Sequence, residues 1–397
     1  MNKKTLEDLP RGVSRVLLRV DFNVPLKGIH ILDRRRIQAT LPTLRALTRA
    51  GHAVVCLSHL GRPDGAPKAG LSLRPVASAL EEMLQDHAVR FIPQCTGRQV
   101  QEAAAALKRG QILVLENLRF HPGEEKADPE FAAALAGLAS AYVNDAFGTA
   151  HRAHASTTTV TRFLSPSVAG ILMEKEIRAL GRITLEIQRP YAAVLGGAKI
   201  SSKIEIIDQL LDRVDRLLIG GAMAYTFLSA MGTGIDSSLV ELDCLGVARQ
   251  LLKKARARKI QILLPVDHRA EGDPTGPPSI LIDSVDIPRA QTACDIGPKT
   301  VAAFSAALES AGTVFWNGPM GVFERPPFAQ GTRYMAQAIA RCPGFTLLGG
   351  GETAAAVRSF GLEDKFDHIS TGGGATLEFL AGHTLPGLEA LDDKKES

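Results

Sequence analysis

The chain has 397 residues, of which 45% are hydrophobic, 22% charged and only 5% aromatic, and its net charge is +4. The length favours two domains, and the low aromatic content argues against a protein that stacks single-stranded nucleic acid on its surface. The first half carries a net positive charge and the second half a net negative one, which is compatible with a polyanion surface or with a small pocket for a highly charged anion.

The cysteines and the start of the chain predict a cytoplasmic protein. The five cysteines are odd in number and include no C-x-x-C pair, so reduced thiols are expected instead of disulfides or a zinc site. The first twelve residues, MNKKTLEDLPRG, have no apolar core, which argues against a signal peptide. The uncharged run at 217–235 contains four glycines, and we interpret it as a buried strand, a turn and an apolar helix, not a membrane span.

In the first half, short apolar runs alternate with helical patterns. The runs, in chain order, are VLLRVDFNVP, AVVCLSHLGRP, ILVLENLRF and SAYVNDAFGTAHRAHA. Near-continuous apolar strands that alternate with helices predict a parallel sheet with helices on both faces. Ligands of such sheets bind at the carboxyl ends of the strands, so the polar residues that follow these runs are the candidates for function.

Two polar residues follow the first run. Asp21 and Asn23, in VDFNVP, are two positions apart, so they would point to the same face of an extended chain. An acceptor and an amide side by side suit the hydroxyl and carboxylate of a small acid. On this motif alone, a turn that satisfies its own Asx hydrogen bonds is an equal alternative.

Basic residues follow the other runs. His59 and Arg62 lie in SHLGRP, Arg119 in LENLRF and Arg152 in AFGTAHRAHA, and Arg36 stands before a predicted helix. Each by itself would be an ordinary surface or structural residue. Together, at the strand ends of one sheet, they predict a pocket for a phosphorylated small acid, because an extended nucleic acid would need a basic stripe along a helix or strand.

A connector follows the first half. The segment MEKEIRALGRITLEI, residues 173–187, predicts a charged amphipathic helix that the pair Arg189 and Pro190 ends. Strands and helices alternate again after it, so this helix is expected to join two domains.

In the second half, glycine follows the strands in place of charged side chains. The runs are YAAVLGGAK, RLLIGGAM, TVFWNGPMG, FTLLGGGET and HISTGGGAT. Glycine turns let backbone N–H groups and helix N-termini approach a phosphate chain or a flat base. The sequence has no strand followed by G-x-G-x-x-G, no Walker lysine and no protein-kinase catalytic loop, so a nucleotide site would be assembled from several turns.

Two lysines follow the first of these turns. Lys199 and Lys203, in LGGAKISSKI, are predicted to share a helical face through their i, i+4 spacing, where two ammonium groups would attract an anion. The alternative is that they are solvated and paired with Glu205 or Asp208. Further along, Glu324 in GVFE is a candidate for binding a ribose hydroxyl.

The motifs together resemble those of the phosphoglycerate kinase family over nearly the whole chain. They are RVDFNVP, SHLGRP, LENLRFHPGEE, NDAFGTAHRAHAS, LGGAKISSKI, FWNGPMGVFE, GGGET and STGGGAT. The resemblance implies reversible phosphoryl transfer from 1,3-bisphosphoglycerate to ADP, giving 3-phosphoglycerate and ATP, with Mg2+. It also implies an α/β fold of two Rossmann-like lobes, each a parallel sheet covered by helices on both faces, joined by a hinge helix.

The resemblance further implies a division of the chain and of the ligands. Residues 1–172, joined by the C-terminal segment 380–397, would bind phosphoglycerate, 173–189 would be the hinge, and 190–379 would bind the nucleotide. By motif position, the phosphoglycerate ligands would be Asp21, Asn23, Arg36, His59, Gly61, Arg62, Arg119 and Arg152. The nucleotide ligands would be Lys199, Lys203, Gly297, Asn317, Glu324, Gly350, Gly351, Glu352 and Thr353.

The chemistry implied is direct in-line transfer after the lobes close, without a covalent enzyme intermediate. Positioning and charge neutralisation would then suffice for catalysis. The groups expected to neutralise the transferring phosphoryl group are Arg36, Lys203 and Lys199 and the amides of the turn that contains Gly372 and Gly373.

The chain departs from the family pattern at one acidic position. The family reads G-G-G-D-[ST], whereas this chain has Glu352. The carboxylate expected to hold magnesium therefore sits one methylene farther out, which bears on metal geometry and preference because magnesium tolerates little distortion. The stretch LDRRRI is also more basic than usual, and no role is assigned to Arg34 or Arg35.

Two alternatives belong to other classes of function. A dehydrogenase of similar build is disfavoured because the dinucleotide fingerprint, with its acid about 20 residues further on, is missing. A nucleic-acid-binding protein could use the basic first half but would need basic residues on an extended surface. We therefore expect a cytoplasmic monomer that binds small-molecule substrates, with no nucleic-acid or membrane partner.

Overall fold

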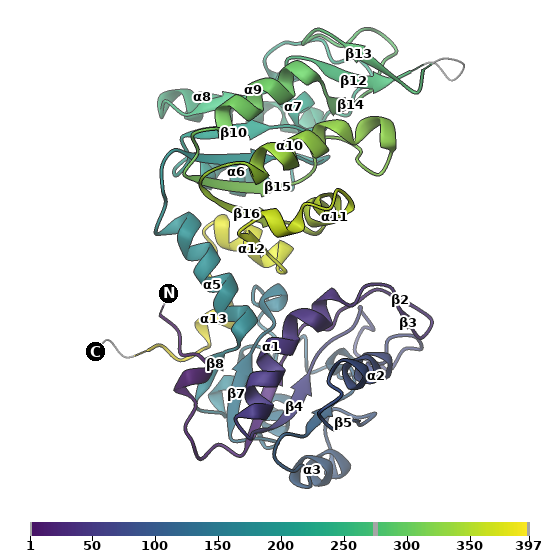
Figure 1. Cartoon of the computed structure of the whole chain (residues 1–397), viewed down its shortest axis with the longest axis vertical. Helices are drawn as coiled ribbons and strands as arrows, with labels where there is room; N and C mark the ends of the chain where they lie inside the picture. Colours follow the sequence, from purple (N-terminus) through teal and green to yellow (C-terminus); the bar gives the residue numbers. More distant parts are fainter. Residues whose placement is uncertain (1, 273–276, 395–397) are drawn as a thin grey trace. The chain divides into compact units, whose positions relative to one another are not determined.

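The computed structural model describes residues 2–272 and 277–394, which form two compact units (Figure 1). Unit 1 contains the chain up to Arg178 and again from Thr384, and unit 2 is Ala179–His383. Each unit is built on its own six-stranded sheet, in which every pair of neighbouring strands is parallel. The predicted class, two Rossmann-like α/β lobes, is therefore confirmed.

The sheet of unit 1 contains the four apolar runs of the first half. Its order is β5 (Val89–Phe91), β6 (Ile112–Val114), β4 (Ala53–Leu57), β1 (Arg15–Arg19), β7 (Ala141–Asn144) and β8 (Ser167–Ala169). The helices of unit 1 include α1 (Arg35–Arg49), α2 (Arg74–Met83), α3 (Arg98–Ala105) and α4 (Pro129–Ala136). Strands β4, β6 and β7 are buried at every position, which explains why their sequences are continuously apolar.

Helices α1 and α2 pack on this sheet. Leu44 of α1 and Leu80 of α2 share one buried cluster with Val16 of β1 and Val54 of β4. Amphipathic helices of this kind are stabilised mainly by the apolar surface that they bury.

The sheet of unit 2 contains the glycine-ended runs. Its order is β11 (Gln261–Leu263), β10 (Arg216–Ile219), β9 (Tyr191–Leu195), β15 (Thr313–Asn317), β16 (Phe345–Gly349) and β17 (His368–Ile369). The helices are α6 (Ile204–Leu210), α7 (Met223–Ala230), α8 (Leu245–Ala257), α9 (Pro298–Leu308), α10 (Gln330–Ala340), α11 (Gly351–Ser359) and α12 (Gly373–Leu380). Trp316 of β15, Phe304 of α9 and Met335 of α10 meet in the core.

The uncharged run at 217–235 is not one continuous element. It forms most of β10, a turn and α7, as predicted. Within residues 2–272 and 277–394, the structure contains no helix that is both long and apolar enough to span a bilayer.

The remaining strands form two small antiparallel sheets. One has the order β13 (Ser279–Ile282), β12 (His268–Glu271) and β14 (Ala293–Ile296) in unit 2, and the other is the hairpin β2 (Leu26–Lys27) and β3 (His30–Ile31) in unit 1. The first has its own apolar cluster, which includes Tyr225 of α7 and Ile282 of β13.

Helix α5 (Ile171–Thr184) is the connector expected at 173–187, and it ends three residues earlier than expected. Its N-terminus is capped from outside by Asp145, whose Oδ1 accepts hydrogen bonds from the backbone N of Leu172 at 2.8 Å and of Met173 at 3.2 Å. The two units divide within this helix, between Arg178 and Ala179.

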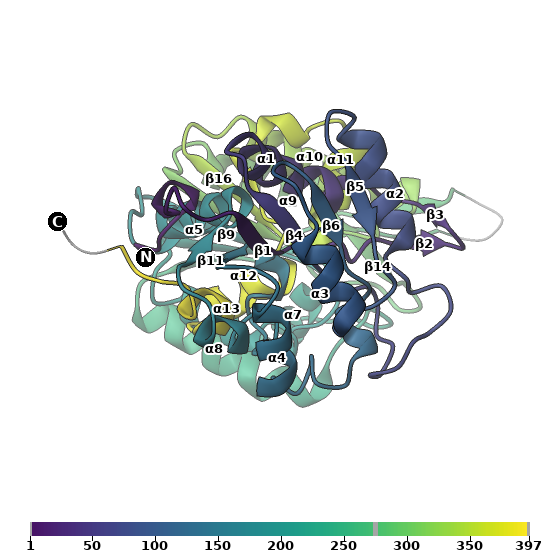
Figure 2. The same ribbon diagram turned by 90° about the horizontal axis from the view of Figure 1, so that it is seen from below.

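The segment after His383 returns to unit 1 and contains the short helix α13 (Pro386–Glu389). The backbone N of Gly387 donates to Ala150 O at 2.8 Å, and that of Asp392 donates to Ser167 O of β8 at 2.9 Å. Lys4 N donates in turn to Asp392 O at 2.8 Å. Figures 1 and 2 both show this segment beside the start of the chain.

Candidate functional site

The polar residues predicted in unit 1 follow four strands that are neighbours in the sheet. The order β6, β4, β1, β7 is continuous, and the carboxyl ends of parallel strands lie along one edge. Asp21 and Asn23 follow β1, His59, Gly61 and Arg62 follow β4, Arg119 lies in the 3-10 helix η2 (Leu118–Phe120) after β6, Arg152 follows β7, and Arg36 is in the first turn of α1.

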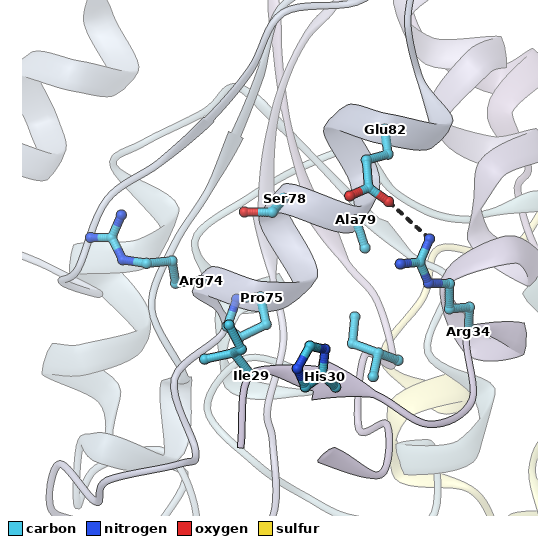
Figure 3. A pocket seen from close by; sticks show the side chains of 9 residues that line it. Ile29, His30, Arg34, Arg74, Pro75, Ser78, Ala79 and Glu82 are labelled. Carbon is cyan, nitrogen blue, oxygen red and sulfur yellow. Dashed lines mark hydrogen bonds and ion pairs between the residues drawn. The ribbon is translucent and has the colours of Figure 1, made fainter. Parts of the chain in front are cut away.

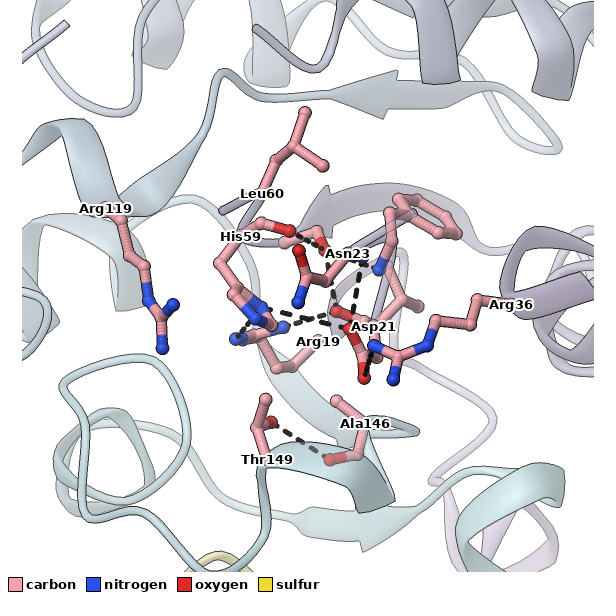
Figure 4. A network of polar contacts seen from close by, with 12 residues as sticks. Arg19, Asp21, Asn23, Arg36, His59, Leu60, Arg119, Ala146 and Thr149 are labelled. Carbon is pink, nitrogen blue, oxygen red and sulfur yellow. Dashed lines mark hydrogen bonds and ion pairs between the residues drawn. The ribbon is translucent and has the colours of Figure 1, made fainter. Parts of the chain in front are cut away.

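Hydrogen bonds link several of these side chains (Figure 4). Arg36 Nη1 donates to Asp21 Oδ2 at 2.7 Å. Asn23 Oδ1 accepts from the backbone N of Gly61 at 2.9 Å, and Arg119 Nη1 donates to Gly61 O at 2.7 Å. The structure thus brings together residues from β1, β4, β6 and α1, with Asp21 held in place by an arginine.

The remaining arginines differ in exposure. Arg62 is exposed, whereas Arg152 is half-buried and its Nε donates to Nε2 of the adjacent His151 at 3.1 Å. Arg119 is buried, and its Nε lies 3.0 Å from Glu125 Oε1 as an ion pair without the alignment of a hydrogen bond. Burial lowers the pKa of Arg119 and Glu125 opposes that effect.

A buried network behind these residues was not identified from the sequence. Arg19, at the end of β1, donates from Nε to Ser156 Oγ at 2.8 Å, and Ser156 Oγ donates to Glu124 Oε1 at 2.6 Å. The Nη2 atom of Arg19 lies 3.3 Å from Nδ1 of His59. An arginine inside the apolar run VLLRVDF was the signal available in the sequence, because a charge in a buried strand requires a partner.

Two histidines near this network are held neutral. Burial lowers the pKa of His59 well below its ordinary value, and the nearby arginines add to that effect. Burial also lowers the pKa of His154 to about 3. At neutral pH the positive charge of this cluster therefore comes from arginine.

In unit 2, a lysine and an asparagine meet at the end of the sheet. Lys203 Nζ donates to Oδ1 of Asn317, the last residue of β15, and Asn317 Nδ2 donates to Gly349 O at 2.8 Å. Burial lowers the pKa of Lys203 to about 8, opposed by the charge of Glu352. This ammonium group is therefore poorly hydrated and is suited to an anionic ligand.

Glycine turns surround this pair. Gly318, after β15, has φ +98°, and a Cβ there would lie 2.2 Å from Gly196 O. Gly350, after β16, has φ +93°, and a Cβ there would lie 2.7 Å from Asn317 Nδ2. Only glycine fits such positions, and their absent side chains let the turns after β9, β15 and β16 pack closely together.

Two helices begin at this edge of the sheet. Helix α11 begins at Gly351, after the cap Gly350, and α12 begins at Gly373, after the cap Gly372. A Cβ on Gly373 would lie 3.7 Å from Gly350 Cα, so the two N-termini are close together. Thr353 of α11 is buried and its hydroxyl accepts from Gly318 N at 2.6 Å. Converging helix N-termini suit phosphate groups.

The predicted helical face for the two lysines is wrong. Helix α6 begins only at Ile204, with Lys203 as its cap and Lys199 in the exposed turn before it. The turn is stabilised by Glu241, whose carboxylate accepts from Ser201 N at 3.0 Å and from the Ser201 hydroxyl. The i, i+4 spacing therefore does not place Lys199 and Lys203 on one helical face.

The other predicted nucleotide residues lie apart from the six-stranded sheet or on its surface. Gly297 caps α9 after β14 of the small sheet, and a Cβ there would lie 2.3 Å from the Asp267 carboxyl carbon. Glu324 is exposed in the loop after β15.

The exposed residue Glu352 lies in the first turn of α11. Its carboxylate is close enough to Lys203 to act on the pKa of that lysine, in the upward direction. Within the described residues there is no group of three or more His, Cys, Asp or Glu that could hold a metal ion. A single carboxylate beside a phosphate site fits magnesium, which commonly takes one or two carboxylates and completes its shell with substrate phosphates and water.

A separate pocket of about 340 Å³ opens on unit 1 beside the hairpin β2–β3 and α2 (Figure 3). None of the predicted ligands of the acid lines it. Arg34 is on its wall, with Nη1 donating to Glu82 Oε2 at 2.9 Å. The lining residues are Ile29, His30, Ile31, Arg34, Arg74, Pro75, Ser78, Ala79 and Glu82.

The two units therefore present different donors at the carboxyl ends of their sheets. Unit 1 offers arginine and carboxamide side chains, which bind carboxylate and phosphate groups in fixed orientations. Unit 2 offers helix N-termini, glycine backbone and one half-buried lysine. This pairing suits a small phosphorylated acid on one unit and a phosphate chain on the other.

Comparisons with known proteins give one consistent result. The model of the phosphoglycerate kinase family matches residues 6–383. Phosphoglycerate kinase of Koribacter versatilis is 50% identical over 404 residues, covering 99% of this chain and 100% of its own, and that of Thermus thermophilus is 53% identical over 392 residues, covering 98% and 100%. The solved phosphoglycerate kinase of Coxiella burnetii aligns with a TM-score of 0.89 at 38% identity and covers 98% of each chain.

Proposed function

The chain belongs to the phosphoglycerate kinase family and catalyses the reversible transfer of a phosphoryl group between 1,3-bisphosphoglycerate and ADP, and we propose that its two units divide these substrates. The reaction yields 3-phosphoglycerate and ATP. A dehydrogenase and a nucleic-acid-binding protein, the alternatives considered from the sequence, do not fit this family.

The phosphoglycerate binds unit 1 in this proposal. Asp21 accepts a hydrogen bond from the hydroxyl group of the acid, and the amide of Asn23 donates one to its carboxylate. The basic residues bind its phosphate, and two of them, Arg36 and Arg119, are already directed by contacts with Asp21 and Gly61. The ligands proposed are Asp21, Asn23, Arg36, His59, Gly61, Arg62, Arg119 and Arg152.

The nucleotide binds unit 2. Lys203 and the N-termini of α11 and α12 receive its phosphates, and Glu324 receives the ribose. The single observation that carries this division is the contrast between the two sheet edges: arginine side chains after β1, β4, β6 and β7, and glycine turns after β9, β15 and β16. The remaining ligands proposed are Lys199, Gly297, Asn317, Gly350, Gly351, Glu352 and Thr353.

The transfer needs no covalent enzyme intermediate, because an acyl phosphate is already a reactive donor. The charge on the transferring group is neutralised by Arg36, Lys203 and Lys199 and by the amides of Gly372 and Gly373. Backbone N–H groups at a helix start have fixed directions and require little reorganisation during the reaction. An anionic phosphate beside Lys203 would also raise the pKa of that lysine and keep it charged.

Magnesium is proposed to bind at Glu352, together with the nucleotide phosphates. When bound, the ion would neutralise phosphate charge and orient the phosphate chain. Glutamate reaches one methylene farther than the aspartate usual in the family, and its exposed position on α11 leaves it free to adjust.

Closure of the two units is proposed to precede transfer. Substrates held on separate units must bring their reacting atoms to about 3 to 3.5 Å and exclude water for direct transfer. The proposed hinges are residues 173–189, which include most of α5, and the segment after Gly374. We further propose a cytoplasmic monomer, which the five free cysteines suit.

The activity is tested by a coupled assay of ATP formation from ADP and 1,3-bisphosphoglycerate, with and without magnesium. The division of substrates is tested by calorimetry with 3-phosphoglycerate and ADP separately. Replacing Arg62 by alanine should weaken binding of the acid alone, and replacing Lys199 by alanine should weaken binding of ADP alone. If either variant weakened binding of 3-phosphoglycerate and of ADP equally, or weakened binding only of the ligand assigned to the other unit, the proposed division would be wrong.

A further inference from the structure

Arg19 is a charged residue in the core of unit 1. None of its surface is exposed (0%), so it does not reach a bound substrate. A buried guanidinium is costly unless its N–H groups have acceptors. Its Nη1 donates to Val20 O and its Nε donates to Ser156 Oγ at 2.8 Å. Its Nη2 lies 3.3 Å from His59 Nδ1 (Figure 4).

The contact with His59 determines where the imidazole carries its proton. A guanidinium has N–H donors and no acceptor, so a hydrogen bond between Arg19 and His59 requires a lone pair on Nδ1. The neutral ring then carries its proton on Nε2. Within residues 2–272 and 277–394, the structure contains no partner for this Nε2, which leaves it available to a ligand.

Glu124 anchors Arg19 through Ser156. Ser156 Oγ accepts from Arg19 and donates to Glu124 Oε1 at 2.6 Å, and Ser156 N donates to Glu124 Oε2 at 3.0 Å. Glu124 is also fully buried. The serine therefore links a buried cation to a buried anion, and it directs the guanidinium toward His59.

The charged groups around His59 favour the same state of the ring. Asp21 Oδ1 lies 4.0 Å from Nδ1, beyond hydrogen-bond distance, and its carboxylate is engaged by Arg36. A proton on Nδ1 would face the N–H groups of Arg19. The other charged groups that act on the ring are cationic: Arg19, Arg36, Arg119 and Arg152.

We propose that Arg19 is a positioning residue that fixes His59 as a neutral imidazole protonated on Nε2, so that His59 gives the bound acid an uncharged N–H donor. This inference rests on the proposed function, because it takes His59 as a ligand of phosphoglycerate. Arg19 acts only through His59 and through its anchor, the Ser156–Glu124 pair.

The state of His59 can be read directly by nitrogen NMR of protein labelled with 15N-histidine. The chain has ten histidines, and His59→Gln identifies the signal of interest. We expect a pyridine-like Nδ1 and a pyrrole-like Nε2 in the free wild-type protein at neutral pH, unchanged on acidification through the ordinary histidine range. A proton on Nδ1, or an imidazolium at neutral pH, would overturn the proposal.

Substitution of Arg19 then tests the cause. In Arg19→Met, His59 should lose its fixed tautomer and titrate nearer its ordinary pKa. The KM for 3-phosphoglycerate should rise about tenfold, as for loss of one hydrogen bond to a charged group, and kcat should change little. Arg19→Lys keeps a buried donor and should therefore recover part of the wild-type tautomer of His59 and part of the wild-type KM.

A matched control is available on the same strand. Arg15 begins β1, and its Nη1 donates to Ala104 O at 2.9 Å, away from His59. Arg15→Met should leave the His59 signals and the KM unchanged. An Arg19→Met protein with the wild-type His59 signals would refute the proposal, and the wild-type spectrum decides the question if that variant does not fold.

Failure of the inference can be separated from failure of the proposed function. If His59→Ala left the KM for 3-phosphoglycerate unchanged, His59 would not be a ligand of the acid, while the tautomer measured by NMR would still stand. If His59→Ala raised the KM but the free protein carried the proton on Nδ1, the ligand assignment would stand and the role of Arg19 would fall.

Discussion

Replacing Lys203 by methionine should make unit 2 more stable while nearly abolishing turnover. Burial lowers the pKa of Lys203 from 10.5 to about 8. At neutral pH the charged lysine therefore lowers the unfolding free energy of unit 2 by about 3 kcal/mol. Methionine removes that cost and loses the hydrogen bond to Asn317, which is worth about 1 to 2 kcal/mol.

The net gain expected at pH 7 is therefore about 1 to 2 kcal/mol. Below the folded pKa of about 8, the lysine is protonated in the folded and unfolded states, and the cost is fully present. As pH rises from there toward the unfolded value of 10.5, the folded state loses its proton first and the cost shrinks. The advantage of the variant should therefore decline across this range. At its upper end only the loss of the hydrogen bond to Asn317 remains, so the variant should be about 1 to 2 kcal/mol less stable there than the wild type.

Urea unfolding followed by tryptophan fluorescence would measure this effect. Trp316 is the only tryptophan of the chain and is fully buried in β15, so its emission reports on unit 2. Turnover in the coupled assay should fall by about a hundredfold to a thousandfold. Lys199→Met is the control, and because this lysine is exposed, its unfolding free energy should change by less than about 0.5 kcal/mol. A destabilised Lys203→Met, or a gain that does not depend on pH, would refute the reasoning.

The remaining predictions concern catalysis, metal binding and closure. Arg36→Ala should lower kcat by about a hundredfold while raising the KM for the acid less, because Arg36 is proposed to neutralise the transferring charge. Arg35→Ala, at the neighbouring exposed position, should leave kcat unchanged. An unchanged kcat in Arg36→Ala would show that Arg36 takes no part in the chemistry. Glu352→Gln should raise the magnesium concentration needed for half-maximal rate and Glu352→Asp should restore it; equal magnesium curves for all three proteins would contradict a metal role. Small-angle scattering should show a smaller radius of gyration with 3-phosphoglycerate and a non-hydrolysable ATP analogue together than with either alone, and no difference would contradict closure.

Much of the fold follows from the sequence by simple rules. The strands that became β1, β4, β6 and β7 are short apolar runs, and burial of both faces of a parallel sheet accounts for them. Because parallel strands end at one edge, residues as far apart as Asp21 and Arg119 could be assigned to the same region. The glycine turns of unit 2 could be identified for the same reason.

Other features depend on contacts that spacing along the chain does not reveal. The network of Arg19, Ser156 and Glu124 joins positions separated by up to 137 residues, and each of the three lies in a motif that also contains a predicted ligand of the acid. The start of α6 at Ile204 depends on the turn that Glu241 stabilises, which the lysine spacing does not predict. The three-stranded sheet of β12, β13 and β14 is made of short strands with polar residues, such as HRAE, and has no distinct apolar pattern.

The return of the last segment to unit 1 has a consequence for biosynthesis. Residues up to Arg178 emerge from the ribosome first, yet β8 receives its hydrogen bond from Asp392 only after the whole of unit 2 has been translated. Unit 2 is one uninterrupted stretch and can complete its own core as it emerges. The unit that is made first is thus the one that is finished last, and a ribosome stalled before residue 384 would hold a completed unit 2 and a unit 1 still missing its final segment.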